Sequence, residues 1–61
     1  MKHYLFEITD GNSDYEGEQF LVGAGSKDEA YEIAYEYFDV EILCLGRISD
    51  MAAEMSGLDE Y

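Results

Sequence analysis

The sequence predicts an α+β fold, a small β-β-α-β-α domain in which one main helix packs on a three-stranded sheet. Two segments near the N-terminus and one after residue 39 have the apolar patterns of β-strands, and a capped segment between them has helical periodicity. The length of 61 residues fits one small domain. We therefore expect a single domain over residues 1–61.

The first two strands are expected to form a hairpin. Residues Lys2–Thr9 alternate between two faces and are rich in aromatic side chains, which is typical of a strand. Residues Asp10–Asp14 are a cluster of turn formers. Residues Glu18–Ala24 resume the alternation, so the connecting loop is longer than the tight two-residue type.

The main helix follows the second strand. Ser26 and Glu29 have the spacing of a capping box, in which Ser26 caps the helix and Glu29 reaches back to it. The helix is expected to end at about Phe38 or Asp39. Its apolar side is formed by Ala30, Ile33, Ala34 and Tyr37, with Phe38 at the edge.

The third strand spans Val40–Ile48, and a short helix follows it. Ser49 or Asp50 caps this helix, which runs to about Ser56 and stops at Gly57. A right-handed crossover allows the third strand to lie beside the first, in an antiparallel sheet, or beside the second, in parallel; we prefer the first arrangement. The face under the main helix is expected to carry Val40, Ile42, Cys44 and Ile48.

The charge balance restricts the functional classes. Fifteen acidic residues against three Lys and Arg give a net charge of −12, while 48% hydrophobic and 15% aromatic residues indicate a folded chain rather than an acidic tail. Three basic residues cannot neutralise many phosphates, so we expect neither direct nucleic-acid binding nor docking on anionic lipid. The sequence has no run of about 18 apolar residues, so we expect no membrane span. The N-terminal segment lacks the order of a signal peptide and Cys44 is the single cysteine, so we expect a cytoplasmic protein.

The acidic residues of the main helix are patterned. At 100° per residue, five of them fall within an arc of about 100°, and Tyr31 and Tyr35 flank that arc. Like charges four residues apart destabilise a helix by about 0.2–0.5 kcal/mol per pair, and no basic residue of the helix offsets this arc. The five residues are Asp28, Glu29, Glu32, Glu36 and Asp39.

This pattern predicts a partner-binding surface. A row of carboxylates presents spaced negative charge to a basic groove built for phosphates, so the expected partner is a basic nucleic-acid-binding host protein. A solvated face without a partner, or adaptation to high salt, are the alternatives. The predicted surface comprises Asp28, Glu29, Glu32, Tyr35, Glu36 and Asp39 of the helix and Asp14, Glu16 and Glu18 of the hairpin.

Small size, extreme acidity and a hairpin followed by the Ser26–Ala34 helix resemble the small phage-encoded inhibitors of bacterial defence, the anti-CRISPR and anti-restriction proteins that imitate DNA. The likeness is architectural, covers about residues 2–48 and carries over no site residues. It implies an inhibitor that acts in the host cytoplasm, where it binds the nucleic-acid-contacting surface of a nuclease complex and blocks access to the target.

Two further patterns resemble functional sites but do not meet the requirements of one. Residues 10–14 begin like a calcium loop, but the sixth and twelfth positions hold Tyr15 and Leu21 where an EF-hand needs Gly and Glu. His3 and Cys44 are assigned to opposite sheet faces, so they do not form a nucleophile–base pair. We therefore expect no metal site, no cofactor and no enzymatic activity.

A leucine face supports the rival hypothesis. In this hypothesis the protein is a small interaction module, and its charge serves only solubility or high-salt adaptation. The face opposite the main helix is expected to carry Leu5, Leu21, Leu43 and Leu45, and an exposed leucine cluster needs cover. We favour cover by Met51, Met55 and Leu58, with a homodimer or a partner as alternatives.

Overall fold

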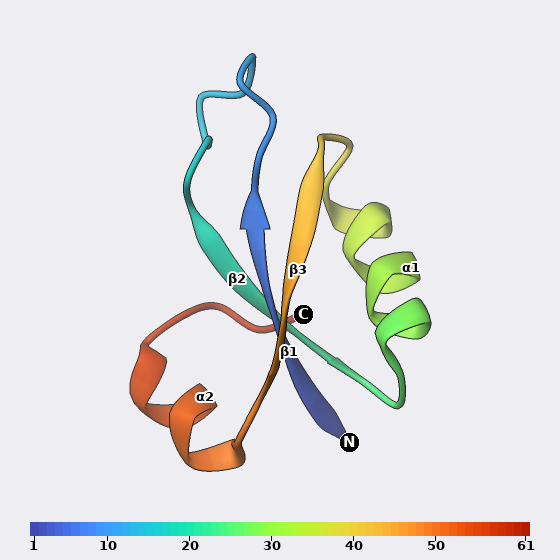
Figure 1. The fold of residues 1–61 in the computed structure, drawn as a ribbon, viewed down its shortest axis with the longest axis vertical. Helices are drawn as coiled ribbons and strands as arrows, with labels where there is room; N and C mark the ends of the chain where they lie inside the picture. The colour runs from blue at the N-terminus through green and yellow to red at the C-terminus, as the bar shows by residue number, and fades with distance from the viewer.

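The computed structural model describes residues 1–61 as a three-stranded sheet with a helix on each face (Figure 1). The strands are β1 (Lys2–Ile8), β2 (Gln19–Ala24) and β3 (Ile42–Ile48), and the helices are α1 (Lys27–Tyr37) and α2 (Asp50–Ser56). Neither helix has the length and apolar character needed to span a membrane. The predicted α+β class and the β-β-α-β-α order are confirmed.

Strand β1 lies in the centre of the sheet. The strand order is β2-β1-β3, and both neighbours run antiparallel to β1. This arrangement confirms the preferred position of the third strand beside the first, because a central β1 gives the most apolar strand two partners. In the hairpin loop the Asn12 N–H donates to Asp10 Oδ1 at 2.9 Å, and Gly17 has a φ of 86°, which favours glycine.

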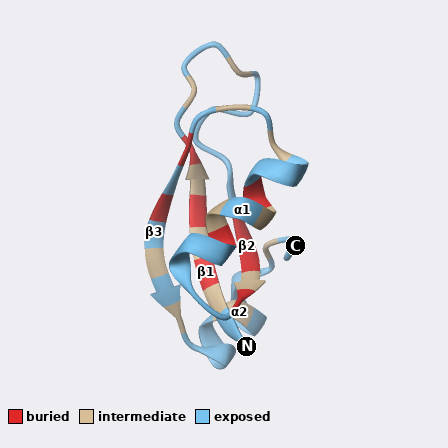
Figure 2. Ribbon diagram, turned by 90° about the vertical axis from the view of Figure 1, so that its right-hand side faces the viewer, coloured by how far each residue is buried: buried red, intermediate tan, exposed pale blue.

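The core lies between the sheet and α1. Figure 2 shows the buried residues concentrated in the strands beneath this helix. Ala30 and Ala34 are the buried residues of α1, and their small side chains let the helix approach the sheet closely. The core residues from the strands are Tyr4, Phe6, Ile8, Phe20, Val22, Ala24, Ile42 and Cys44.

A bulge in β3 changes which side chains face α1. Phe6 pairs with Cys44 but Leu5 pairs with Gly46, so Leu45 is the extra residue, and Gly46 has a φ of 131°. Paired residues of antiparallel strands share a face. Ile48 pairs with His3 on the face opposite α1, so its predicted place under the helix is wrong.

The ends of both helices follow the predictions with two differences. The Glu29 N–H donates to Ser26 Oγ at 3.2 Å, but the Glu29 carboxylate accepts from the Gly25 N–H at 3.1 Å rather than from Ser26. Helix α2 is capped by Ser49 and ends at Gly57, whose φ is 70°, as predicted. Helix α1 ends at Tyr37, earlier than predicted, because the backbone of the next residue is already extended.

The C-terminal residues return to the free edge of β2, which the sequence analysis did not predict. The Leu21 N–H donates to the Asp59 carbonyl at 2.9 Å, and the Tyr61 N–H donates to the Leu21 carbonyl at 2.8 Å. The Gly23 N–H donates to the Tyr61 carbonyl at 2.9 Å. Residues 59–61 therefore act as a short parallel strand, which we call the C-terminal tail, and they cover an edge that would otherwise be open.

The leucine face is only partly covered. Leu21 is buried and Leu58 is half-buried. Met51 and Met55 are 71% and 80% exposed, so their predicted role as cover is wrong, because the side of α2 that bears them is turned to solvent. Leu43 and Leu45 remain 49% and 46% exposed.

Candidate functional site

All nine residues of the predicted partner-binding surface are exposed. Thirteen of the fifteen acidic residues in the chain are exposed, and the remaining two, Glu7 and Asp10, are half-buried. The fold therefore leaves nearly the whole negative charge at the surface.

None of these carboxylates is paired with Lys or Arg. The only ion pairs join His3 to Asp50 and to Glu60. On most protein surfaces acidic and basic side chains are interspersed, which limits self-repulsion. Here two of the fifteen acidic side chains contact His3, and the other thirteen have no cationic partner within the chain.

Four of the unpaired carboxylates lie on the outward side of α1. Ala30 and Ala34 turn the opposite side of the helix to the sheet, and the intervening acidic positions are exposed. The Glu29 carboxylate also accepts from a backbone N–H at the helix start, so it has a structural role as well. We call this set the acidic helix face: Asp28, Glu29, Glu32 and Glu36.

Asp39 does not belong to this face. It lies beyond the end of α1, so the helical spacing that placed it on the arc does not apply to it. It lines a shallow open depression with Tyr35, and the other residues there are Asp10, Val40 and Glu41. The ring of Tyr35 stacks beside Tyr31 at a centroid distance of 6.2 Å, at the edge of the acidic helix face, as its helical position indicated.

The hairpin acids form a separate group. Asp14 and Glu16 lie on the loop that projects beyond the sheet, away from the start of α1 (Figure 1). Glu18 precedes β2 and lines a pocket with aromatic walls. The structure therefore divides the predicted surface between the outward side of α1 and the hairpin end of the molecule.

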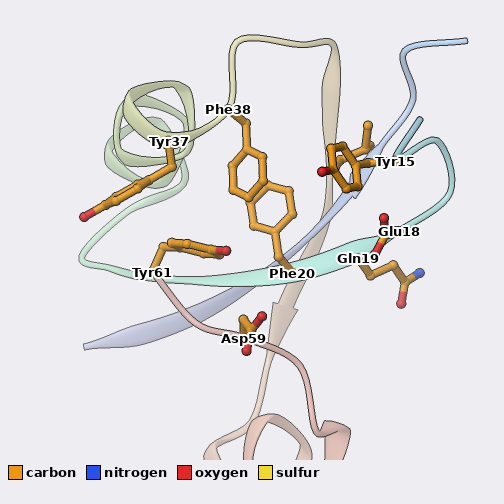
Figure 3. Close-up of a pocket in the computed structure, with 9 residues that line it drawn as sticks. Tyr15, Glu18, Gln19, Phe20, Tyr37, Phe38, Asp59 and Tyr61 are labelled. Carbon is orange, nitrogen blue, oxygen red and sulfur yellow. The ribbon is translucent and has the colours of Figure 1, made fainter. Parts of the chain in front are cut away.

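The pocket beside Glu18 lies between the hairpin, the end of α1 and the C-terminal tail. It has a volume of about 420 Å³, and Figure 3 shows aromatic side chains from all three segments around it. We call it the aromatic pocket. Its lining residues are Ile8, Tyr15, Glu18, Gln19, Phe20, Tyr37, Phe38, Asp59 and Tyr61.

Sequence reasoning missed this pocket because it placed Tyr37 on the apolar side of the helix and gave no position to the C-terminal tail. Tyr37 was expected on the apolar side of the helix, but it is 62% exposed at the last residue of α1. Asp59 and Tyr61 reach the pocket only because the C-terminal tail pairs with β2. The adjacent aromatic residues Tyr37 and Phe38 at the end of the helix were the available signal.

His3 connects three segments of the chain. Its Nε2 lies 2.9 Å from Asp50 Oδ1 at the start of α2, and its Nδ1 contacts a Glu60 carboxylate oxygen in the C-terminal tail. The hydrogen bond to Glu60 and the negative charges of both carboxylates raise the pKa of His3 above its ordinary value of 6.5. The side chain is 20% exposed, so this histidine has a structural role that its strand-start position did not suggest.

The structure keeps Cys44 apart from His3. Cys44 pairs with Phe6 and is buried beneath α1, whereas His3 pairs with Gly23 and Ile48 on the opposite face. No group of three or more His, Cys, Asp or Glu side chains is arranged to hold a metal ion.

Comparisons with protein-family models, with curated proteins and with solved structures find no match.

Proposed function

We propose that this protein is a non-catalytic acidic binding protein that mimics nucleic-acid charge. It occupies the nucleic-acid site of a basic host protein, such as a CRISPR or restriction nuclease complex, and blocks access to the target. The observation that carries this proposal is the exposure of eleven carboxylates that no Lys, Arg or His of the chain neutralises.

The spacing of the acidic helix face supports the proposal. Its four carboxylates lie within residues 28–36, which span about 12 Å of helix axis and so provide about one charge per 3–4 Å. One strand of B-DNA carries a charge about every 3.4 Å. A basic groove shaped for a phosphate strand therefore meets a similar charge density on α1.

The energetics favour a charged partner as well. The pairs Asp28–Glu32, Glu29–Glu32 and Glu32–Glu36 together cost about 1 kcal/mol of helix stability at low salt. A basic partner relieves this repulsion on binding. Association is then fast, and its affinity falls as salt screens the charges.

A second candidate function rests on the incompletely covered leucine face. Leu43 and Leu45 are about half exposed on β3, and β3 is an edge strand. Met51 and Met55 add exposed and adaptable apolar surface on α2. In this alternative the protein is a small interaction module that binds through these four residues, and its charge serves only solubility.

A pair of matched variants tests the proposal. Glu32→Gln with Glu36→Gln removes two charges from the acidic helix face, and Glu41→Gln with Glu54→Gln removes two exposed charges elsewhere. Each protein is immobilised, bacterial lysate is passed over it, and bound proteins are eluted with duplex DNA. We expect the helix variant to lose the DNA-eluted proteins and the control variant to retain them. Equal retention by both variants contradicts nucleic-acid mimicry.

The same capture experiment separates the second candidate. Leu43→Glu with Leu45→Glu leaves the acidic helix face intact and makes the leucine face polar. If the leucine face is the contact surface, this variant loses its partner while it stays folded by circular dichroism. If the acidic helix face is the contact surface, the variant keeps the proteins that DNA elutes.

A further inference from the structure

The aromatic pocket is built from rings whose faces are held in place by one another. The ring of Phe38 stacks on Phe20 with 4.3 Å between centroids and 21° between planes. Tyr61 meets both rings edge-on, at 5.2 Å and 5.8 Å. Tyr37 lies against Tyr61 at 5.0 Å (Figure 3). These mutual contacts hold the walls in place without a ligand.

The pocket is negative as well as aromatic. Glu18 and Asp59 line it, neither carboxylate takes part in an ion pair, and no lining residue is basic. Their backbones are fixed: the Glu18 carbonyl accepts from the Ile8 N–H at 2.9 Å, and the Asp59 carbonyl accepts from Leu21. No hydrogen bond or ion pair within the chain uses either carboxylate, so both are free to accept from a ligand in the pocket.

This combination selects a particular cation. Aromatic faces attract cations through the ring quadrupole, and the chain supplies no cation of its own to the pocket. A guanidinium stacks flat on a ring and also offers five N–H donors to carboxylates, whereas a quaternary ammonium has no donor and a lysine ammonium is a strongly hydrated point charge. The volume of about 420 Å³ lies in the range of small-ligand sites.

We infer that the aromatic pocket binds an arginine side chain of the partner protein. The guanidinium stacks against the tyrosine rings and donates to Glu18 and Asp59. This site deepens the proposed function, on which it rests for the existence of a basic partner. It adds a specific anchor at the hairpin end of the molecule to the long-range attraction of the acidic helix face.

Short blocked peptides test the pocket separately from the partner. The probes are Gly-Arg-Gly, Gly-Lys-Gly and Gly-trimethyllysine-Gly, each acetylated and amidated, titrated into the full chain. NMR shifts of the tyrosine ring protons report binding, and circular dichroism confirms the fold of each variant. We expect the arginine peptide to bind about fivefold or more tightly than the lysine peptide and to shift the rings of Tyr15, Tyr37 and Tyr61.

Two pocket variants and one control locate the binding. Glu18→Gln with Asp59→Asn, and separately Tyr37→Leu, are expected to weaken arginine-peptide binding by about fivefold or more. Glu41→Gln with Glu54→Gln removes the same charge outside the pocket and is expected to change it by less than about twofold. Tyr37 is exposed and the Asp59 bond to β2 is made by its backbone, so neither pocket variant removes a core contact.

The outcomes are distinct. Equal binding of arginine and lysine peptides, an equal loss in both charge variants, or tighter binding of trimethyllysine each overturn the assignment to arginine. If no peptide binds while the Glu32 and Glu36 variant loses its partner, the pocket inference fails and the proposed function stands. If the pocket binds arginine while that variant keeps its partner, the proposed function fails and the pocket stands.

Discussion

The two faces of the sheet are covered by helices of different kinds. Helix α1 is eleven residues long, buries two alanines and encloses a continuous core with the strands. Helix α2 is seven residues long and has no buried residue. On its side of the sheet Leu21 is buried, whereas Leu43 and Leu45 are left about half exposed.

The difference separates the parts that hold the fold from the parts that are available for contacts. The α1 face holds the apolar burial, which is the main favourable term in folding. On the other side, three backbone hydrogen bonds attach the C-terminal tail to β2, and His3 contacts Asp50 of α2 and Glu60 of the tail. Substitutions on the two faces should therefore lower the free energy of unfolding by different amounts.

The largest effect is expected beneath α1. Phe6 is fully buried, stacks on Phe20 at 5.4 Å and meets Tyr31 edge-on at 5.0 Å. Phe6→Ala is expected to cost about 3–5 kcal/mol, which is comparable with the total of about 3–9 kcal/mol for a chain of this length. Urea denaturation followed by circular dichroism measures it. A variant that unfolds at nearly the same urea concentration would show that this face does not dominate stability.

A smaller effect is expected beside the C-terminal tail. Leu21 is as well buried as Phe6, but its neighbour along the edge of β2 is the short C-terminal tail, which can shift to accommodate a smaller side chain. Leu21→Ala is expected to cost about 2–3 kcal/mol, in the lower part of the range for buried leucine. The same denaturation experiment ranks the two faces. A loss larger than that of Phe6→Ala contradicts the ranking.

The attachment of the tail should depend on pH through His3. Its pKa is raised in the folded state by the Glu60 hydrogen bond and by the nearby carboxylates, so the folded protein holds the proton more tightly. This stabilisation is fully present below pH 6.5 and is lost as the pH rises through the raised pKa. His3→Gln is expected to abolish it.

The measurement is the stability difference between the wild type and the His3→Gln variant from about pH 5 to about pH 9. The difference should shrink with rising pH. Amide exchange of Leu21 and Gly23, whose N–H groups donate to the tail, reports whether the loss is local. If the difference is constant with pH, the protonation of His3 does not stabilise the attachment of the C-terminal tail.

The smallest effect is expected at the open part of the leucine face. Leu43 is about half exposed, so Leu43→Thr removes about half the burial of a leucine, and it introduces a β-branched side chain of the kind that strands favour. The expected cost is about 1 kcal/mol. Thermal denaturation measures it. A cost as large as that of Leu21→Ala would indicate that this leucine is covered in solution, as by a second copy of the chain.

Local features of the fold were predictable, and the reasons lie in particular residues. Ser26, Ser49 and Gly57 cap helices through contacts with residues at most three or four positions away, so their roles are visible in the sequence. The acids of α1 are exposed as predicted because Ala30 and Ala34 set the direction of the buried side. Asp39 was misplaced because the helix ends two residues before it.

The aromatic pocket was not predictable because its parts are distant in the chain. Glu18, Tyr37 and Asp59 come from three segments, and only the pairing of the tail with β2 brings the last of them close. Backbone hydrogen bonds of that kind carry no side-chain pattern. The bulge at Leu45 is similar, since its register shift depends on how β3 meets β1.

The sequence by itself determined the order of the elements, their caps, the apolar side of α1 and the outward row of acids, because each follows from the period of a helix or strand and from contacts within a few residues. Only the tertiary structure decided the register of β3, the return of residues 59–61, the position of His3 between two carboxylates and the aromatic pocket. These features depend on contacts between segments far apart in the chain, which no local pattern encodes.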